Sequence, residues 1–298
     1  MVGERLLGVV GLLCAAVLVG AMGRFAAGPS PAYAAVTLPG TATEQLAVAA
    51  DALEAAMAKG GGGLTFDVVQ RNTLHAKADG PLIGVRDPAD PTRVIAEVDT
   101  YAVSAIVSRG AVTADAFWME MRVALDKEAA DFTAAGFFAR VLARDGVIWR
   151  DDGDGWHVTD ISPGTGMDPV SARLLPKLLR SAGDASILQA ELVDGRLLPG
   201  VRGTAAVADY PGVIASDGKV FTDAAFEVRY WLDEAGRLVR LETSARNLNE
   251  SDYELVATTI VTFGYGATGD PPEPSPTMPP ELLYPAPEPE PEAVEVAS

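Results

Sequence analysis

The residues that could carry out chemistry are few and stand far apart in the sequence. There are two histidines, His75 and His157, and a single cysteine, Cys14. A histidine serves as a general base when a nucleophile or a carboxylate is held beside it. The sequence contains no H-E-x-x-H, G-x-S-x-G or phosphate-binding glycine motif. It therefore predicts no enzyme and no catalytic residues, although a Ser-His-Asp arrangement built from distant segments stays open as a hydrolase alternative.

Clustered carboxylates make the segment Asp151-Asp152-Gly153-Asp154-Gly155 the best candidate for a cation site. Carboxylate oxygens suit calcium, but the segment lacks the EF-hand spacing and its terminal glutamate. Asp and Gly also strongly favour tight turns. The sequence therefore predicts a turn between two strands, and neither a metal nor a cofactor is expected.

The first 34 residues predict export. A short polar start, Met1–Arg5, is followed by an unbroken apolar stretch, Leu6–Met22, and then by small residues typical of a cleavage site. This stretch is nearly as long as a membrane span, so an uncleaved signal anchor is the alternative. Leu13 precedes Cys14, where a lipobox requires a small residue. We expect an exported protein, extracellular, on the cell surface or periplasmic, whose cleavage would remove its only thiol.

Charge separates the rest of the chain into a domain and a tail. The chain has 23 basic and 41 acidic residues, a net charge of −18. Nucleic acid is excluded as a partner, because its phosphates require a basic face. Residues 270–298 are rich in Pro-Glu repeats and contain no basic residue, so they lack the material for an apolar core. We expect one domain over 35–269 and a disordered tail over 270–298.

Two helices are expected within the domain. Thr41 to Glu44 fits a capping box, and apolar residues then recur at helical spacing, which predicts a helix over 44–59. Pro169 opens a second helix with one apolar stripe. Pro176 lies inside this second segment and should kink the helix or divide it in two.

The remaining segments predict about ten strands that pair with their neighbours in sequence. Short Asp-Gly connections between apolar runs are strong hairpin signals. Long strands are expected over 64–76 and 253–265. A hairpin is expected across Arg109-Gly110, joining 92–108 to 111–125. An antiparallel sheet with one covered face accounts for this pattern.

The order of these elements resembles the bacterial lipoprotein-carrier superfamily over roughly residues 41–266. The local match is the closing hairpin, Trp231-Leu-Asp-Glu-Ala-Gly-Arg-Leu-Val-Arg-Leu-Glu242, followed by the strand that ends at Tyr265. The superfamily includes the LolA-type carriers and the mycobacterial LppX and LprG type lipoproteins. The resemblance implies an α+β fold, with a long antiparallel meander curved into a half-barrel and helices on its concave face. The missing lipobox departs from the lipoprotein members and puts a lipid anchor in doubt.

The resemblance also implies a ligand, a lipid or other apolar small molecule held between sheet and helices. Each buried methylene contributes about 0.8 kcal/mol, so an acyl chain needs no specific polar contact. The candidate lining residues are apolar side chains of the second helix and of facing strands: Leu174, Leu175, Leu178, Leu179, Phe117, Met119, Met121, Trp149, Phe226 and Val228.

The same residues are also what an ordinary core contains. A cell-surface structural or interaction module with a solid core and a Pro/Glu-rich docking tail is therefore the alternative. A membrane tether is possible in either case, and the sequence identifies no delivery partner.

Overall fold

The structure, a computed structural model, describes residues 37–87, 89–124, 126, 130–159, 169–206, 225–247 and 253–274. The leader and the tail beyond residue 274 lie outside these ranges, so the domain boundaries and the export signal stay predictions. Within the described ranges, no helix has the length and hydrophobicity needed to cross a membrane.

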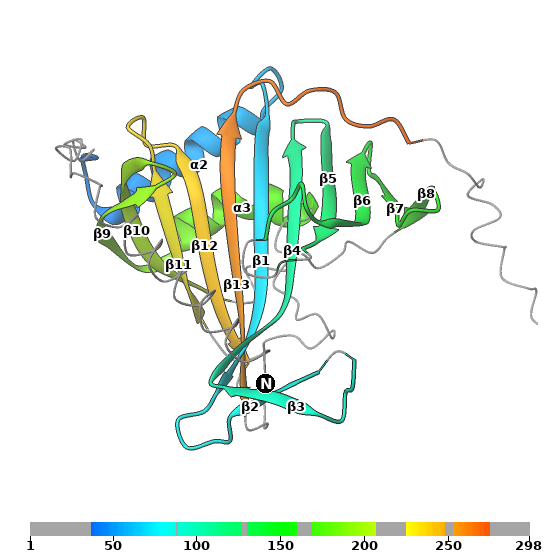
Figure 1. The fold of residues 1–298 in the computed structure, drawn as a ribbon. Helices are drawn as coiled ribbons and strands as arrows, with labels where there is room; N and C mark the ends of the chain where they lie inside the picture. Colours follow the sequence, from blue (N-terminus) through cyan, green and yellow to red (C-terminus); the bar gives the residue numbers. More distant parts are fainter. Residues whose placement is uncertain are drawn as a thin grey trace, which may run out of the picture.

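Eleven antiparallel strands form one curved sheet in the order β8-β7-β6-β5-β4-β1-β13-β12-β11-β10-β9 (Figure 1). The strands are β1 (Leu64–Ala76), β4 (Thr100–Val112), β5 (Ala116–Val123), β6 (Gly136–Arg144), β7 (Val147–Asp151), β8 (Trp156–Thr159), β9 (Gly183–Val193), β10 (Arg196–Ala206), β11 (Ala225–Leu232), β12 (Leu238–Asn247) and β13 (Tyr253–Tyr265). A separate hairpin joins β2 (Ile83–Arg86) to β3 (Val94–Val98).

The first and last long strands lie side by side at the centre of the sheet. Leu64 at the start of β1 is opposite Tyr265 at the end of β13, and β4 pairs with the other edge of β1. From this central pair, one meander runs outward to β8 and another to β9. Apart from the β1–β13 pair, each strand of this sheet pairs with a neighbour in sequence, β1 with β4 across the small β2–β3 hairpin.

Two helices, α2 (Ala42–Met57) and α3 (Pro169–Ser181), lie across the concave face of the sheet (Figure 1). The predicted capping box of α2 is present: Thr41 N donates to Glu44 Oε2 at 2.7 Å, and Glu44 N donates to Thr41 Oγ1 at 3.3 Å. Pro176 lies inside α3, which is nonetheless one undivided helix. The predicted α+β fold, an open curved sheet with helices on its concave face, is confirmed.

The hairpin predicted at Arg109-Gly110 is wrong. Both residues lie within β4, and the chain turns after Thr113, whose backbone N donates to Ala116 O at 2.8 Å. A Cβ on Gly110 would overlap the backbone carbonyl oxygen of Trp118 on β5 and would lie 2.6 Å from Cζ of Phe66 on β1. The glycine therefore makes room for the backbone of one neighbouring strand and an aromatic ring of the other, whereas its sequence context alone is typical of a turn.

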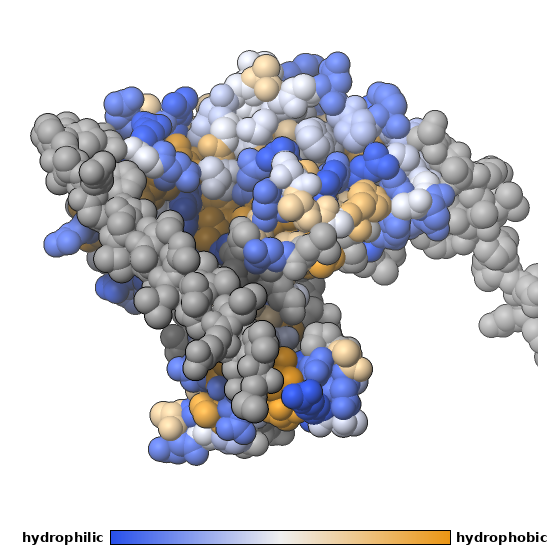
Figure 2. Space-filling view, viewed as in Figure 1, coloured by the Kyte–Doolittle hydropathy of each residue, from blue (hydrophilic) through white to orange (hydrophobic). Residues whose placement is uncertain are grey.

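Apolar side chains are exposed at the end of the molecule that carries the β2–β3 hairpin. Figure 2 shows hydrophobic residues on this projection, away from the helices. The exposed side chains there are Leu82, Val94, Ile95, Tyr101 and Val103.

Candidate functional site

The two helices lie side by side and both contribute to the core. Their buried residues include the small side chains of Ala49, Ala50 and Ala172. On the exposed side, Arg180 Nη2 on α3 donates to Asp51 Oδ1 on α2 at 2.6 Å, and the same guanidinium binds Glu54. The helices thus form one layer, tied by an ion pair, over the sheet.

Most of the predicted lining residues meet in one hydrophobic core beneath this layer. Leu175, Leu178 and Leu179 on α3 are buried with Phe117, Met119 and Met121 on β5 and Val228 on β11. Phe66 of β1 lies among them, and its ring stacks on Phe117 with centroids 5.6 Å apart. Buried apolar side chains of both helices and of eight strands contribute to this core cluster.

Three predicted residues do not belong to this cluster. Leu174 is on α3 but is half-buried. Phe226 pairs with Ala205 in the register of β11 with β10, and its side chain lies outside the described part. Trp149 is opposite Leu142, which is opposite Trp118, so all three lie on the convex face, away from the helices. The prediction for Trp149 fails because β7 carries apolar residues at consecutive positions, which leaves its alternation ambiguous.

Several residues that complete the core were not among the predicted lining residues. They come from α2, β1, β12 and β13 and include Leu46, Leu53, Leu64, Phe66, Leu241 and Val261. The sequence does indicate that these residues are buried, through the alternation of apolar residues in the strands and the apolar stripe of α2. What the sequence did not supply was the pairing that brings these strands under α3.

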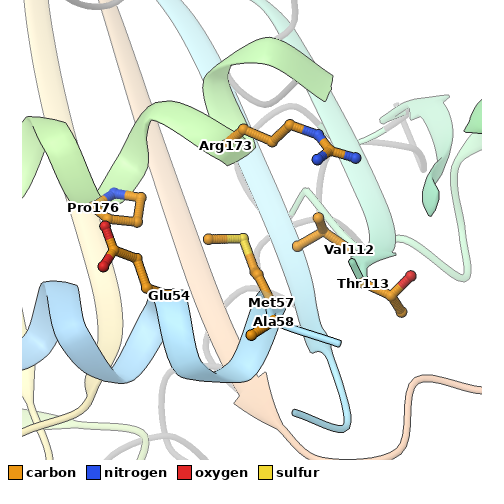
Figure 3. Close-up of a pocket in the computed structure, with 7 residues that line it drawn as sticks. All are labelled: Glu54, Met57, Ala58, Val112, Thr113, Arg173 and Pro176. Atoms are coloured by element: carbon orange, nitrogen blue, oxygen red, sulfur yellow. The ribbon is translucent and has the colours of Figure 1, made fainter. Parts of the chain in front are cut away.

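A small open pocket lies where the C-terminal end of α2 approaches α3 and the end of β4. Its volume is about 220 Å³, and it is lined by Glu54, Met57, Ala58, Val112, Thr113, Arg173 and Pro176 (Figure 3). Val112 belongs to the core, so one wall of the pocket is the edge of the apolar layer. None of the ten predicted lining residues lines this pocket. Ordinary ligand pockets have volumes of about 300–1,000 Å³, so a long chain would not fit without displacing side chains.

The concave face changes character along its length. In the register of β1, Val68 is followed on the same face by Gln70 and Asn72. The row containing Val68 is apolar through Val261 and Leu241, and it ends on the β4 side at Ser108. The next row contains Gln70, Thr259 and Thr243. An apolar end under the helices thus gives way to uncharged polar side chains toward β2 and β3.

Tyr265 is the residue of the core region with a strongly perturbed acid–base equilibrium. Burial raises the pKa of its phenol far above the usual value, and the carboxylate of Asp233 adds to the rise. Its hydroxyl donates to Leu238 O at 3.1 Å. Arg237 lies over its ring, 5.0 Å from the centroid. The phenol therefore stays neutral and acts as a structural hydrogen-bond donor.

The predicted turn at Asp151 to Gly155 is confirmed, and its leading carboxylate binds the protein itself. Asp151 Oδ1 accepts hydrogen bonds from the backbone N of Gly153 at 2.8 Å and of Gly155 at 3.1 Å, while Oδ2 accepts from Arg140 at 2.7 Å. Burial raises the pKa of Asp151, but these hydrogen bonds outweigh it and hold the pKa below its usual value. Over the described residues, no group of three or more His, Cys, Asp or Glu is placed to hold a metal ion.

The two histidines lie in different parts of the sheet. His75 is in the central strand β1, with its Nδ1 3.4 Å from Thr100 Oγ1. His157 is in the edge strand β8, opposite Arg150. The central and edge strands do not bring the two imidazoles into one site.

Solved structures with a similar arrangement come from several bacteria. LprF from Mycobacterium bovis is 14% identical, with 79% of this chain and 100% of that chain covered and a TM-score of 0.45. The lipoprotein LppX from Mycobacterium tuberculosis is 13% identical, with 78% and 98% covered and a TM-score of 0.39. A LolA superfamily protein from Nitrosomonas europaea is 10% identical, with 78% and 96% covered and a TM-score of 0.24.

These likenesses concern the arrangement of the chain alone. No protein-family model matches the chain, and no curated protein matches it in sequence. The open curved sheet with two helices is the α+β architecture that the sequence predicted.

Proposed function

We propose that this protein is a non-enzymatic carrier that holds a lipid or another apolar small molecule between the sheet and the α2–α3 layer. The observation that carries the proposal is the continuous uncharged apolar layer between an open sheet and a two-helix layer. Apolar contacts are not directional, so such a layer exchanges one apolar partner for another more readily than a hydrogen-bonded one. The leader extends the proposal to an exported protein.

Binding a long chain requires the helix layer to move away from the sheet. The pocket beside Val112 has a volume of about 220 Å³ and opens onto the edge of the core. An acyl chain of about sixteen carbons gains roughly 12 kcal/mol on leaving water, at about 0.8 kcal/mol per methylene. That gain offsets the core contacts that a displaced α3 would lose. Met119 and Met121 lie in this layer, and flexible thioether side chains adapt to irregular contents.

The position of the tryptophans provides a test. Strand register places Trp118, Trp149, Trp156 and Trp231 on the convex face. A stearic acid carrying bromine atoms quenches tryptophan fluorescence on contact. Bound under the helices, it should quench a Phe117→Trp variant on the concave face strongly, and the wild-type tryptophans much less.

The wild-type protein is the matched control for this variant. Equal quenching of both proteins, or none of either, would count against a site under the helices. Mass spectrometry of lipid extracted from the purified protein supplies an independent readout, in which a carrier yields a defined apolar molecule.

A second function is favoured by the packing itself. Seven of the ten predicted lining residues lie in the filled core, as in a structural or interaction module. The start of the tail is held to the domain, because Arg144 Nη1 binds Glu273 Oε1 at 3.2 Å and Nη2 binds Oε2 at 3.3 Å. Deleting residues 275–298 keeps this ion pair. Loss of a partner on that deletion, with no lipid uptake in either protein, would support the module.

A further inference from the structure

Six uncharged polar side chains line the concave face just beyond the apolar layer. They are Gln70 and Asn72 on β1, Ser104 and Ser108 on β4, Thr243 on β12 and Thr259 on β13, together called the polar strip. Gln70 is directly opposite Thr259, and Thr259 is opposite Thr243. Asn72 is opposite Ser104, and Ser108 is opposite Val68, at the border with the apolar row. These six residues lie on the four adjacent strands β4, β1, β13 and β12, and Ile106 of β4, opposite Gln70, interrupts them between the two serines.

Four of the six side chains are buried although they are polar, and Gln70 and Ser104 are half-buried. Ser108 and Thr243 are each 2% exposed, and Thr259 is 6% exposed. Asn72 Nδ2 donates to Ser104 Oγ at 3.0 Å, which satisfies that pair. Among the described residues, however, Ser108 Oγ and Gln70 Oε1 are buried atoms with no hydrogen-bond partner. Buried polar atoms without partners are rare in native proteins and costly, so these two atoms call for a partner that the described chain does not provide.

The chemistry of the polar strip defines that partner. The amide oxygen of Gln70 accepts hydrogen bonds, and the serine and threonine hydroxyls both donate and accept. The polar strip contains no arginine, lysine or histidine to neutralise a carboxylate or a phosphate, and burying an unpaired charge there would be strongly unfavourable. A neutral group with hydroxyl or amide donors fits. Val68, Val261 and Leu241, which lie side by side next to the polar strip, are apolar, so such a group would continue into a hydrocarbon chain.

We propose that the polar strip is the subsite for the neutral, hydrogen-bonding head group of the carried molecule. The carried class is then an uncharged amphiphile with hydroxyl or amide groups, in preference to a free fatty acid. This inference rests on the proposed carrier function. It assigns the polar group to the sheet end nearer β2 and β3 and the hydrocarbon to the space beneath α3.

The experiment compares binding of two probes that share one acyl chain, monopalmitoylglycerol and methyl palmitate, with sodium palmitate as a charged third probe. Two added hydrogen bonds of ordinary strength correspond to roughly a tenfold preference for monopalmitoylglycerol over the methyl ester. Sodium palmitate should bind more weakly than monopalmitoylglycerol at neutral pH. Binding is read by displacement of a fluorescent fatty-acid analogue from the full-length protein.

Substitutions in the polar strip test whether it causes the preference for monopalmitoylglycerol. Gln70→Met and Ser108→Ala remove hydrogen-bonding atoms with little change of shape, and each should reduce the preference several-fold while binding of methyl palmitate stays the same. Thr259→Val tests the same strand pair, and Thr262→Val is its matched control, because Thr262 lies on the convex face of β13. Thermal unfolding of each variant verifies that it folds, and Thr259→Val stands in for any variant that does not.

The outcomes separate the two proposals. Uptake of methyl palmitate with no preference for the glycerol ester, or a preference that survives Gln70→Met, overturns the head-group assignment alone. Tighter binding of palmitate than of monopalmitoylglycerol also overturns it. Uptake of none of the three probes overturns the carrier function and this inference with it.

Discussion

Truncation of Leu179 to alanine tests whether the space under the helices is core, ligand space or both. The side chain is 1% exposed, so nearly all of it is removed from water. The substitution deletes three carbon atoms, a transfer contribution of about 2.4 kcal/mol at about 0.8 kcal/mol per group. The cavity left behind adds to this value, and buried leucines replaced by alanine commonly cost about 3–5 kcal/mol in total. We expect the free energy of unfolding to fall by about 3–4 kcal/mol.

Urea denaturation followed by circular dichroism measures this change. Leu174→Ala on the same helix is the control, because Leu174 is only half-buried and should cost about half as much. Adding an apolar ligand at about one hundred times its dissociation constant should restore about 2.7 kcal/mol by mass action. At one fixed ligand concentration, a carrier predicts that the ligand stabilises Leu179→Ala more than the wild type, since the vacated space accepts it and lowers the dissociation constant. A loss below about 1 kcal/mol would refute the packing described for α3.

Three further perturbations give independent tests. Gly110→Ala should destabilise by about 1–3 kcal/mol, because its new Cβ would overlap the backbone carbonyl oxygen of Trp118 and lie 2.6 Å from Cζ of Phe66. Gly84→Ala in β2 meets only ordinary contacts and should change stability by less than about 0.5 kcal/mol in the same urea assay. The pKa of Asp151 is lowered in the folded protein. The wild type should therefore be more stable than Asp151→Asn by a margin that is full above the unfolded pKa near 4 and shrinks as pH falls through the folded pKa. A margin that grows in acid would contradict the hydrogen bonds to the carboxylate. Arg180→Gln removes the ion pair between α3 and α2, so uptake of a fluorescent fatty acid should become faster and less dependent on salt, and an unchanged rate would show that the pair does not restrain opening.

Local signals predicted most of the secondary structure. The strands 64–76 and 253–265 were predicted with the bounds that the structure gives them. The capping box fixed the start of α2 to within two residues, because it is a hydrogen-bonding pattern written into four consecutive positions. These elements depend on short-range alternation and capping, which a single sequence displays directly.

Long-range pairing was not accessible in the same way. The partners Thr65 and Gly264 are 199 positions apart, and no local pattern specifies which strand accepts the open edge of β1. Gly110 illustrates the same limit, since the atoms that leave no room for a side chain there, the backbone of Trp118 and the ring of Phe66, belong to two other strands. The sequence did not predict on which face of the sheet Trp149 lies, because a short strand with consecutive apolar residues has no clear alternation.

The polar strip emerges only after the strands are paired. In the sequence of β1 alone, Gln70 and Asn72 are polar residues that follow the apolar residues Leu64, Phe66 and Val68. Ser108 and Thr259 are unremarkable members of their own strands. Register assembles them into one surface, so its recognition required the fold.

The pairing of β1 with β13 affects the order in which the protein can fold during synthesis. A polypeptide emerges from the ribosome or a translocation pore with its N-terminus first, so β1 is available long before its permanent neighbour. The arm from β4 to β8 and the arm from β9 to β12 form by short-range ladders, which close quickly. The pairing of β1 with β13 requires residues up to Tyr265 to have been made. Until then the open edge of β1 has no partner strand, and the apolar faces of the two arms are not joined into one core.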